Sequence, residues 1–231
     1  MVFEQVTHVI FDFDGLLVDT ERAYTIANTK VLKDFGKEYT MELKRMQMGK
    51  RHGEAIGWLI SEMGIKNLVT EQEYLKKLDD VTDELFEKTA AMPGAEKLVR
   101  YLRDKDVPVG LCTGSCSRTY PPKAKNHADW LDLIKLQVLA GDDPEITRGK
   151  PDPEPFLLTM KRFKIQPASP KNVLVFEDSY NGVLSALAAG MQCVMVPDRS
   201  VFDPETDSDF KSRVTQVLDS LEDFEPQLYK L

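Results

Sequence analysis

The chain has 231 residues, of which 42% are hydrophobic and 29% charged, and its formal net charge is −8. This composition is ordinary for a globular protein that buries a hydrophobic core. The negative charge argues against a nucleic-acid backbone or an anionic membrane surface as the main partner, because either would favour a basic face. A small anion stays compatible with it, since one pocket can be positive on an acidic protein.

The cysteines and the N-terminal residues indicate the cellular compartment of the protein. Three cysteines, Cys112, Cys116 and Cys193, cannot all pair with one another, and none belongs to a Cys-x-x-Cys motif. We therefore expect free thiols and no zinc site, as in a reducing compartment. The first six residues lack a basic flank, and no apolar run approaches the length of a bilayer-spanning helix. These features predict a cytoplasmic protein.

The first predicted element is the strand 8–11, a short apolar run without alternation, which suits burial on both faces of a sheet. The next part, residues 20–91, contains no convincing strand. Its apolar residues repeat at helical spacing in three segments, 27–35, 56–63 and 74–86. We therefore predict a helical cap domain, residues 20–91, inserted into a core formed by residues 1–19 and 92–231. Ligands of open α/β sheets sit outside the carboxyl ends of the strands, so this cap would cover the site.

Strands and helices alternate in the rest of the chain. Further apolar runs predict strands at 107–112, 136–140 (the weakest), 172–176 and 192–196. Helical spacing between them predicts helices at 95–102, 155–163 and 181–189. From Ser208 on we expect a helix and a short tail. The alternation predicts an α/β fold, with a Rossmann-like parallel sheet and helices on both faces.

Two aspartates follow the first strand, in the run Asp12-Phe13-Asp14-Gly15. Carboxylates two residues apart on an extended chain point to the same side, and paired carboxylates suit Mg²⁺. A calcium loop of the EF-hand kind would need its glycine at the sixth position, but Gly15 is fourth. The remaining alternative is a surface turn that is rich in aspartate by accident.

This motif and three others resemble the haloacid dehalogenase superfamily of phosphotransferases. The family's first motif is a strand that ends in Asp-x-Asp-Gly. The other three are matched, in order, by Leu111-Cys112-Thr113-Gly114-Ser115, Gly149-Lys150-Pro151-Asp152-Pro153, and Phe176-Glu177-Asp178-Ser179 with Gly182. The resemblance therefore covers nearly the whole chain.

The resemblance implies a role for each motif. Asp12 is the expected nucleophile, and Lys150 would offset the charge of the phosphate beside it. Thr113 and the amides of Gly114 and Ser115 would hold the phosphoryl oxygens. The catalytic set is thus Asp12, Asp14, Thr113 and Lys150, the phosphate-binding set is Thr113, Gly114, Ser115 and Lys150, and Mg²⁺ would be held by Asp12, Asp14, Asp178 and Glu177.

Asp14 separates reaction types within the family. Family dehalogenases lack an aspartate two residues after the nucleophile, whereas phosphatases use it to protonate the leaving oxygen and then to activate water. The resemblance therefore implies a Mg²⁺-dependent phosphomonoesterase with an aspartyl-phosphate intermediate. As alternatives we keep a sugar-phosphate mutase resembling β-phosphoglucomutase, and a non-catalytic binding protein. The latter would be expected to lack one of the four charged residues of the motifs, and all four are present.

The cap bears on the substrate. Small helical caps accompany small soluble substrates, so we expect a small-molecule phosphate ester as partner, no nucleic acid, no membrane and a monomer. Lys50 and Arg51 are the cap residues that could reach the substrate. Asp142 and Asp143 are predicted to be solvated. The full pattern most resembles the pseudouridine-5′-phosphatase branch, except in the segment 116–132, where Tyr120-Pro121-Pro122 and Trp130 depart from it.

Overall fold

The computed structural model describes residues 4–202 and 212–231. At its centre is a six-stranded sheet with the order β3-β2-β1-β4-β5-β6, in which all neighbouring strands are parallel. The strands are β1 (His8–Phe11), β2 (Val109–Thr113), β3 (Leu136–Leu139), β4 (Val173–Glu177), β5 (Gln192–Met195) and β6 (Gln216–Val217). The first five lie where the apolar runs predicted them, which confirms the parallel sheet.

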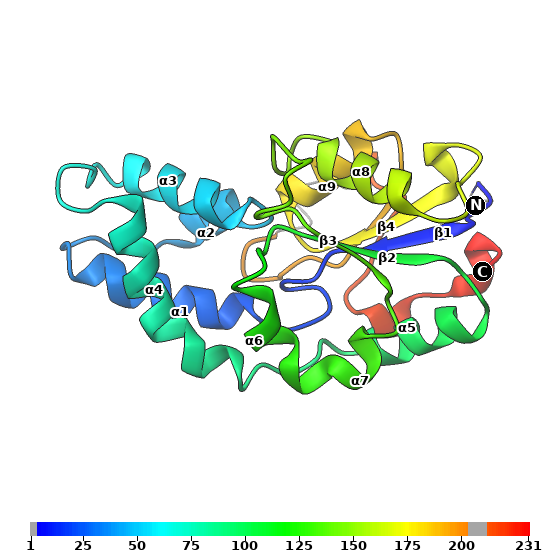
Figure 1. The fold of residues 1–231 in the computed structure, drawn as a ribbon, viewed down its shortest axis with the longest axis horizontal. Helices are drawn as coiled ribbons and strands as arrows, with labels where there is room; N and C mark the ends of the chain where they lie inside the picture. Colours follow the sequence, from blue (N-terminus) through cyan, green and yellow to red (C-terminus); the bar gives the residue numbers. More distant parts are fainter. Residues whose placement is uncertain (1–3, 203–211) are drawn as a thin grey trace.

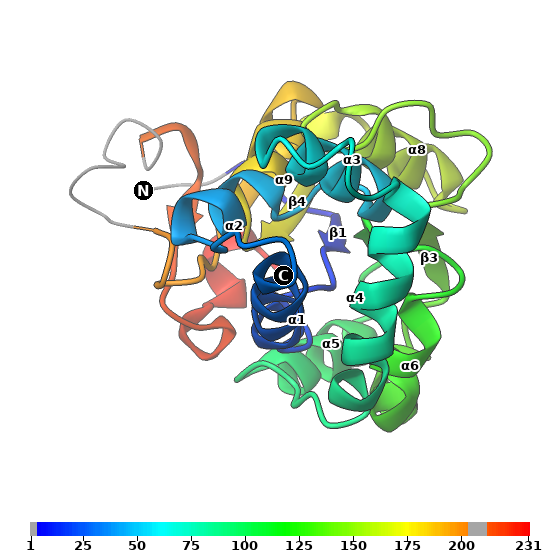
Figure 2. The ribbon, with the colours of Figure 1, turned by 90° about the vertical axis from the view of Figure 1, so that its left-hand side faces the viewer.

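Alternate side chains of each strand enter two hydrophobic clusters on opposite faces of the sheet. In β1, Val9 and Phe11 belong to one cluster and Ile10 to the other. Helices cover both faces, and the views in Figures 1 and 2 agree with this arrangement. The first face carries α5 (Ala95–Asp104), α6 (Tyr120–Ala124) and α7 (Ala128–Leu131), and the second carries α8 (Glu154–Arg162) and α9 (Tyr180–Ala188). The short 3-10 helix η1 (Lys125–His127) joins α6 to α7, and η2 (Pro170–Asn172) directly precedes β4. Two-sided burial explains why the central strands β1, β2 and β4 are mostly apolar.

Four helices stand at one end of the sheet and enclose a core of their own (Figure 1). They are α1 (Glu21–Lys33), α2 (Met41–Gln47), α3 (His52–Glu62) and α4 (Glu71–Phe86). A capping box of Thr70 and Glu73 starts α4. We call residues 20–91 the cap. Helical periodicity predicted α1, α3 and α4 but not α2, which is only seven residues long. The division of the chain into domains at these boundaries stays a prediction.

The prediction for the C-terminal part is wrong beyond residue 213. Residues 208–211 lie outside the described residues, and 214–231 hold β6 and two short 3-10 helices, η3 (Leu221–Asp223) and η4 (Pro226–Tyr229), in place of the expected longer helix. Buried Val214, Leu218 and Leu221 have helical spacing, but the backbone beside them pairs with β5. The amides of Thr215 and Leu218 donate to β5 carbonyls. Pairing the backbone groups of this edge strand therefore outweighs the helical spacing of the apolar side chains.

The thiols and the lengths of the helices complete the description of the fold. All three cysteines are free thiols, as expected, and Cys112 and Cys193 are buried. Among the helices of the described ranges, none combines the length and the apolar character needed to cross a membrane.

Candidate active site

The motif residues meet at the carboxyl end of the sheet. Asp12 directly follows β1, Thr113 ends β2, and Glu177 ends β4. Because β2 and β4 flank β1 in parallel register, their ends lie side by side. The cap lies across this end of the sheet (Figure 2). The fold therefore brings residues that are more than a hundred positions apart into one site under the cap.

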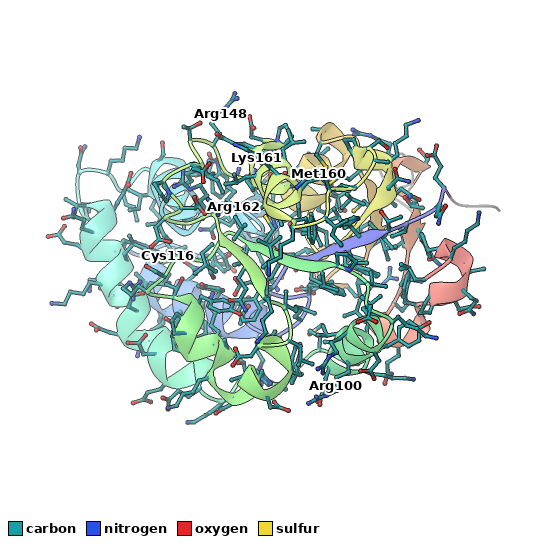
Figure 3. The ribbon with its side chains drawn as sticks, turned by 45° about the vertical axis from the view of Figure 1, so that its right-hand side comes forward. Arg100, Cys116, Arg148, Met160, Lys161 and Arg162 are labelled. Carbon is teal, nitrogen blue, oxygen red and sulfur yellow. The ribbon has the colours of Figure 1, made fainter. Side chains whose placement is uncertain are left out.

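Lys150 forms the centre of a buried charge network. Its Nζ lies 2.5 Å from Asp12 Oδ1, 2.6 Å from Glu177 Oε1 and 3.0 Å from the Cys112 carbonyl oxygen. Burial alone would lower the pKa of Lys150, but the charges of Asp12 and Glu177 hold it well above its usual range. The neighbouring Arg148 projects outward instead (Figure 3), with its side chain 75% exposed. Lys150 is thus a permanent positive charge beside Asp12.

Three carboxylates form a cluster that could hold a cation. One ligand oxygen each from Asp12, Glu177 and Asp178 lies within 4.8 Å of the others. Asp178 Oδ2 is the one buried side-chain polar atom without a hydrogen-bond partner among the described residues. Gly15 leaves room for it, because a Cβ there would come within 2.3 Å of that oxygen. An all-oxygen donor set suits a hard divalent cation, so the residues fit such an ion.

Burial is the main influence on the acidity of this cluster. Burial raises the pKa of Asp12 to about 8, although the Lys150 ammonium opposes the rise, and the charges of Glu177 and Asp14 add to it. Burial, followed by the charges of Glu177 and Asp12, also holds the pKa of Asp178 well above its usual range. A nucleophilic carboxylate must be ionised. A bound cation would favour that form of Asp12.

The Asp14 carboxylate is held by other groups. It accepts hydrogen bonds from the Thr20 hydroxyl (2.8 Å), the Thr113 hydroxyl (3.1 Å), the Ser115 hydroxyl (2.7 Å) and the Lys123 ammonium (2.6 Å). Burial alone would raise the pKa of Asp14, but the Lys123 charge and the hydrogen bonds outweigh it and lower the pKa. Asp14 is outside the cluster described above. Its expected role as a metal ligand gains no support from this geometry and stays a prediction.

The loop after β2 carries the expected phosphate-binding groups. Gly114 and Ser115 line the cavity above Asp12. The Thr113 hydroxyl donates to Asp14 and accepts from the Ser115 amide, so it already has two partners inside the protein. Thr113 is therefore placed to order the loop and Asp14, and its direct contact with phosphate stays a prediction.

The two basic residues of the cap have different surroundings. Lys50 lines the cavity between cap and core. Arg51 donates to the carbonyl oxygens of Thr147 (3.3 Å) and Gly141 (3.2 Å), so it fastens the start of α3 to the core. Both are half-buried. The structure thus brings Lys50 toward the substrate space, whereas Arg51 faces the core loops.

The prediction for the acidic pair after β3 holds for only one of the two residues. Asp142 is exposed, although it accepts hydrogen bonds from the amide and hydroxyl of Ser117. Asp143 is wrongly predicted as solvated, because its side chain is 10% exposed and pairs with Arg162 at 2.5 Å and 3.0 Å. Two-point pairing with a guanidinium explains why this carboxylate is held in the loop.

The sequence interpretation missed Lys123, Tyr24 and Glu21. Lys123 lies on α6, which starts with Tyr120 and two prolines, and its ammonium contacts Asp14. Tyr24 and Glu21 come from α1 and line the cavity. Burial raises the pKa of Glu21 to about 7, with the Lys44 charge opposing the rise. The prolines that mark the segment as unusual were the one local signal, because proline favours the first turn of a helix.

Cap and core line a cavity of about 80 Å³ that is partly open to solvent. Its floor is formed by Asp12, Asp14, Gly114 and Ser115. The cap contributes four polar uncharged side chains, Tyr24, Asn28, Tyr39 and Gln47, together with Glu21, Lys50 and a comparable number of apolar residues. A compact ligand with hydroxyl groups would find hydrogen-bond partners on these walls.

Comparisons with known proteins agree with this geometry. The family model described as haloacid dehalogenase-like hydrolase matches residues 6–190. The Arabidopsis thaliana protein "(DL)-glycerol-3-phosphatase 2" is 39% identical over 98% of this chain and 92% of its own. The Drosophila melanogaster protein "Probable pseudouridine-5′-phosphatase" is 39% identical over 100% of this chain and 96% of its own.

A solved structure extends the likeness in fold. The β-phosphoglucomutase of Clostridium difficile superimposes with a TM-score of 0.79, covering 97% of each chain at 21% identity. At that identity the likeness supports the fold alone. The parallel sheet with its helical insertion is therefore shared with a protein whose described reaction is different from that of the two phosphatases above.

Proposed function

Because this chain belongs to the haloacid dehalogenase-like hydrolase family, we propose that it is a Mg²⁺-dependent phosphatase in which Asp12 is the covalent nucleophile. Its relatives support a small-metabolite phosphomonoesterase, since they are described as phosphatases over nearly the full chain. The observation that carries the proposed mechanism is the meeting of Asp12 and Asp14 in the cavity between cap and core, with the Lys150 ammonium 2.5 Å from Asp12 Oδ1.

In the proposed first step, an Asp12 carboxylate oxygen attacks phosphorus, and the bond from phosphorus to the ester oxygen breaks. Lys150 keeps a positive charge beside the reacting oxygens, which reduces the repulsion between two anions. Asp14 supplies the proton that the departing alkoxide takes up. The products of this step are an alcohol and a phosphorylated Asp12.

In the second step, Asp14 accepts a proton from water, which attacks the phosphorus of the aspartyl phosphate and releases inorganic phosphate. The four donors around the Asp14 carboxylate keep it pointed toward the cavity that contains Asp12. The lowered pKa of Asp14 favours the ionised form that the second step needs, and the first step draws on the minor protonated form, so one residue serves both steps in turn.

Asp12 and Asp178 would hold Mg²⁺ directly, whereas Glu177 would contact Lys150 beside them. When bound, the cation supplies positive charge that stabilises the phosphoryl oxygens during transfer. The residues themselves suit this role, because Asp178 Oδ2 is buried with no partner in the described ranges and lies in a cluster of oxygen donors. Glu177 instead accepts from Lys150, from two amides and from the Ser179 hydroxyl.

Two substrates are proposed from the relatives. Sequence resemblance favours pseudouridine 5′-phosphate, and the glycerol-3-phosphatase relatives are equally similar. The cavity of about 80 Å³ is well below the roughly 300–1,000 Å³ of pockets that enclose drug-sized ligands. The small volume therefore favours a three-carbon phosphate over a nucleotide, which would need more space between cap and core.

The test is phosphate release from sugar, nucleoside and polyol monophosphates, with Mg²⁺ and with chelator. We expect turnover only with the metal, and loss of turnover by several orders of magnitude in Asp12→Asn, which keeps the size of the side chain but removes its nucleophilic charge. Full activity in Asp12→Asn or in chelator would end this mechanism. A requirement for a sugar 1,6-bisphosphate would assign the chain to the mutases instead.

A further inference from the structure

Lys123 is a buried lysine that lies outside the four sequence motifs. Its side chain has no exposed surface. The ammonium lies 2.6 Å from Asp14 Oδ1, 2.7 Å from Ser115 Oγ and 2.7 Å from the Tyr24 hydroxyl. An ammonium has three donors, and here each one has an acceptor. Burying a charge is costly unless it is paired and hydrogen-bonded, so the surroundings of Lys123 are built for this charge.

The partners of Lys123 come from both parts of the molecule. Asp14 and Ser115 belong to the core, whereas Tyr24 lies on α1 of the cap. The Lys123 Nζ also lies 4.7 Å from the centre of the Tyr24 ring and 4.9 Å from that of Phe86, on α4 of the cap. At these distances the electron-rich faces of the rings attract a cation. Part of the stabilisation of the Lys123 ammonium therefore depends on the cap being in place.

We propose that Lys123 is a positioning residue that couples closure of the cap to the orientation of the Asp14 carboxylate. With the cap closed, Lys123 holds Asp14 Oδ1, while the Ser115 hydroxyl, itself bonded to Lys123, holds Oδ2. Without the cap, the ammonium loses the Tyr24 hydroxyl and both aromatic faces. The consequence rests on the proposed function: Asp14 is correctly aimed for proton transfer only when the substrate is enclosed.

This role predicts a selective kinetic effect. A poor leaving group, such as the alkoxide of glycerol 3-phosphate, needs the proton from Asp14, whereas p-nitrophenolate hardly needs one. The value of kcat/KM reports the step that transfers phosphate to Asp12, so misplacing Asp14 should lower it far more for the alkyl ester. A partly unfolded enzyme would lose the same factor with both esters, and the ratio of the two values cancels that loss.

The experiment measures this ratio in Lys123→Met, in Tyr24→Phe and in the double variant. In Lys123→Met we expect the alkyl-to-aryl ratio of kcat/KM to fall roughly 10- to 100-fold, within the range that general acids contribute. Tyr24→Phe should give a smaller fall in the same direction. The double variant should fall no further than Lys123→Met, because Tyr24 is proposed to act through the lysine.

Lys125→Met is the matched control. It removes a lysine two positions away that is 64% exposed and pairs with Glu87 near the end of α4, and its ratio should equal that of the wild type. If Lys123→Met does not fold, the fall of the alkyl-to-aryl ratio in Tyr24→Phe becomes the test, since that variant keeps the lysine. The coupling is overturned if the alkyl-to-aryl ratio of the variant used as the test equals the wild-type ratio. It is also overturned if the falls in the two single variants add fully in the double variant. Wild-type protein that hydrolyses neither ester, or an Asp12→Asn variant with full activity, would overturn the proposed function first and this inference with it.

Discussion

At the scale of single residues, the neighbours Glu177 and Asp178 have different roles within one acidic motif. Glu177 has both oxygens engaged, one by Lys150 at 2.6 Å and the other by the amides of Asp178 and Ser179 and the Ser179 hydroxyl. Asp178 Oδ2 has no hydrogen-bond partner in the part of the chain that the structure describes. We infer that Glu177 orders Lys150 and the start of α9, whereas Asp178 is available to the metal.

Replacing each of these two acids should therefore affect a different measurement. Asp178→Asn should raise the Mg²⁺ concentration for half-maximal activity by about 100-fold or more without lowering stability in metal-free buffer. Glu177→Gln should lower the free energy of unfolding by about 3 kcal/mol, because it removes one partner of a buried ion pair. Activity against Mg²⁺ concentration and metal-free urea denaturation measure the two effects. If both variants showed the same change in Mg²⁺ requirement and in stability, the two acids would not have separate roles.

The motif residues could be predicted from sequence because each one ends or follows a recognisable strand. Lys123 could not, although it contacts the same carboxylate. Its ion pair with Asp14 spans 109 positions and depends on how α6 turns after Tyr120. Nothing in the local pattern shows that a lysine after two prolines is buried. Contacts of this kind become visible only when the packing is known.

At the scale of elements, the start of α3 rests on the loop that follows β2 in the core. A Cβ at Gly114 would come within 2.5 Å of the Lys50 carbonyl oxygen, which is backbone and cannot simply rotate away. The absence of a side chain at Gly114 thus permits the cap to sit directly above Asp12.

Gly114→Ala should prevent this close seating of the cap. We expect kcat/KM for a small phosphate ester to fall by about tenfold or more, roughly 1.4 kcal/mol of transition-state stabilisation. The matched control is Gly53→Ala on α3, where a Cβ would meet nothing within 4 Å. Kinetics of both variants with one substrate test this. Wild-type kcat/KM in Gly114→Ala would show that the contact is not kept in the active conformation.

The ion pair between Asp143 and Arg162 joins the loop after β3 to α8. Hydrogen bonds from Arg162 lower the pKa of Asp143, although burial opposes them. The pair therefore stabilises the fold at pH values above the ordinary Asp pKa, and the stabilisation is lost as the pH falls through the lowered pKa. Asp143→Asn should be about 1–2 kcal/mol less stable at pH 7.

The pH dependence of this difference is the check. Urea denaturation of wild type and Asp143→Asn should show a constant gap from neutral pH down to about pH 5, and a shrinking gap below about pH 4. Asp142→Asn is the control, because Asp142 is exposed and has no salt bridge within the described ranges. A gap that does not change with pH would assign the effect of Asp143→Asn to something other than the charge.

The elements themselves differ in how well the sequence predicts them. Strands buried on both faces give continuous apolar runs, which is why β1 and β4 were found within a residue of their ends. The short helix α2 has too few turns to show a period. Strand β6 is only two residues long and exists because β5 offers an open edge, so its origin is tertiary rather than local.

At the scale of the whole molecule, the structure shows the cap closed onto the core. Lys44 of α2 pairs with Asp198 at 2.5 Å, Arg118 pairs with Asp79 of α4 at 2.7 Å, and the Asn181 side chain donates to the Met48 carbonyl oxygen. These contacts join α2, α4 and Met48 of the cap to the core. Closure of this kind excludes water during phosphoryl transfer and commits a bound substrate to reaction.

The central claim is that phosphate passes through Asp12, and trapping the intermediate tests it most directly. In Asp14→Asn with Mg²⁺ and p-nitrophenyl phosphate, the first step needs little help from an acid, whereas attack by water has lost its base. We predict a burst of one p-nitrophenol per enzyme molecule and, after rapid quenching, peptide mass spectrometry that places one phosphoryl group on Asp12. No burst and no phosphoryl group on Asp12, in an enzyme whose wild type turns over the same ester, would contradict the account.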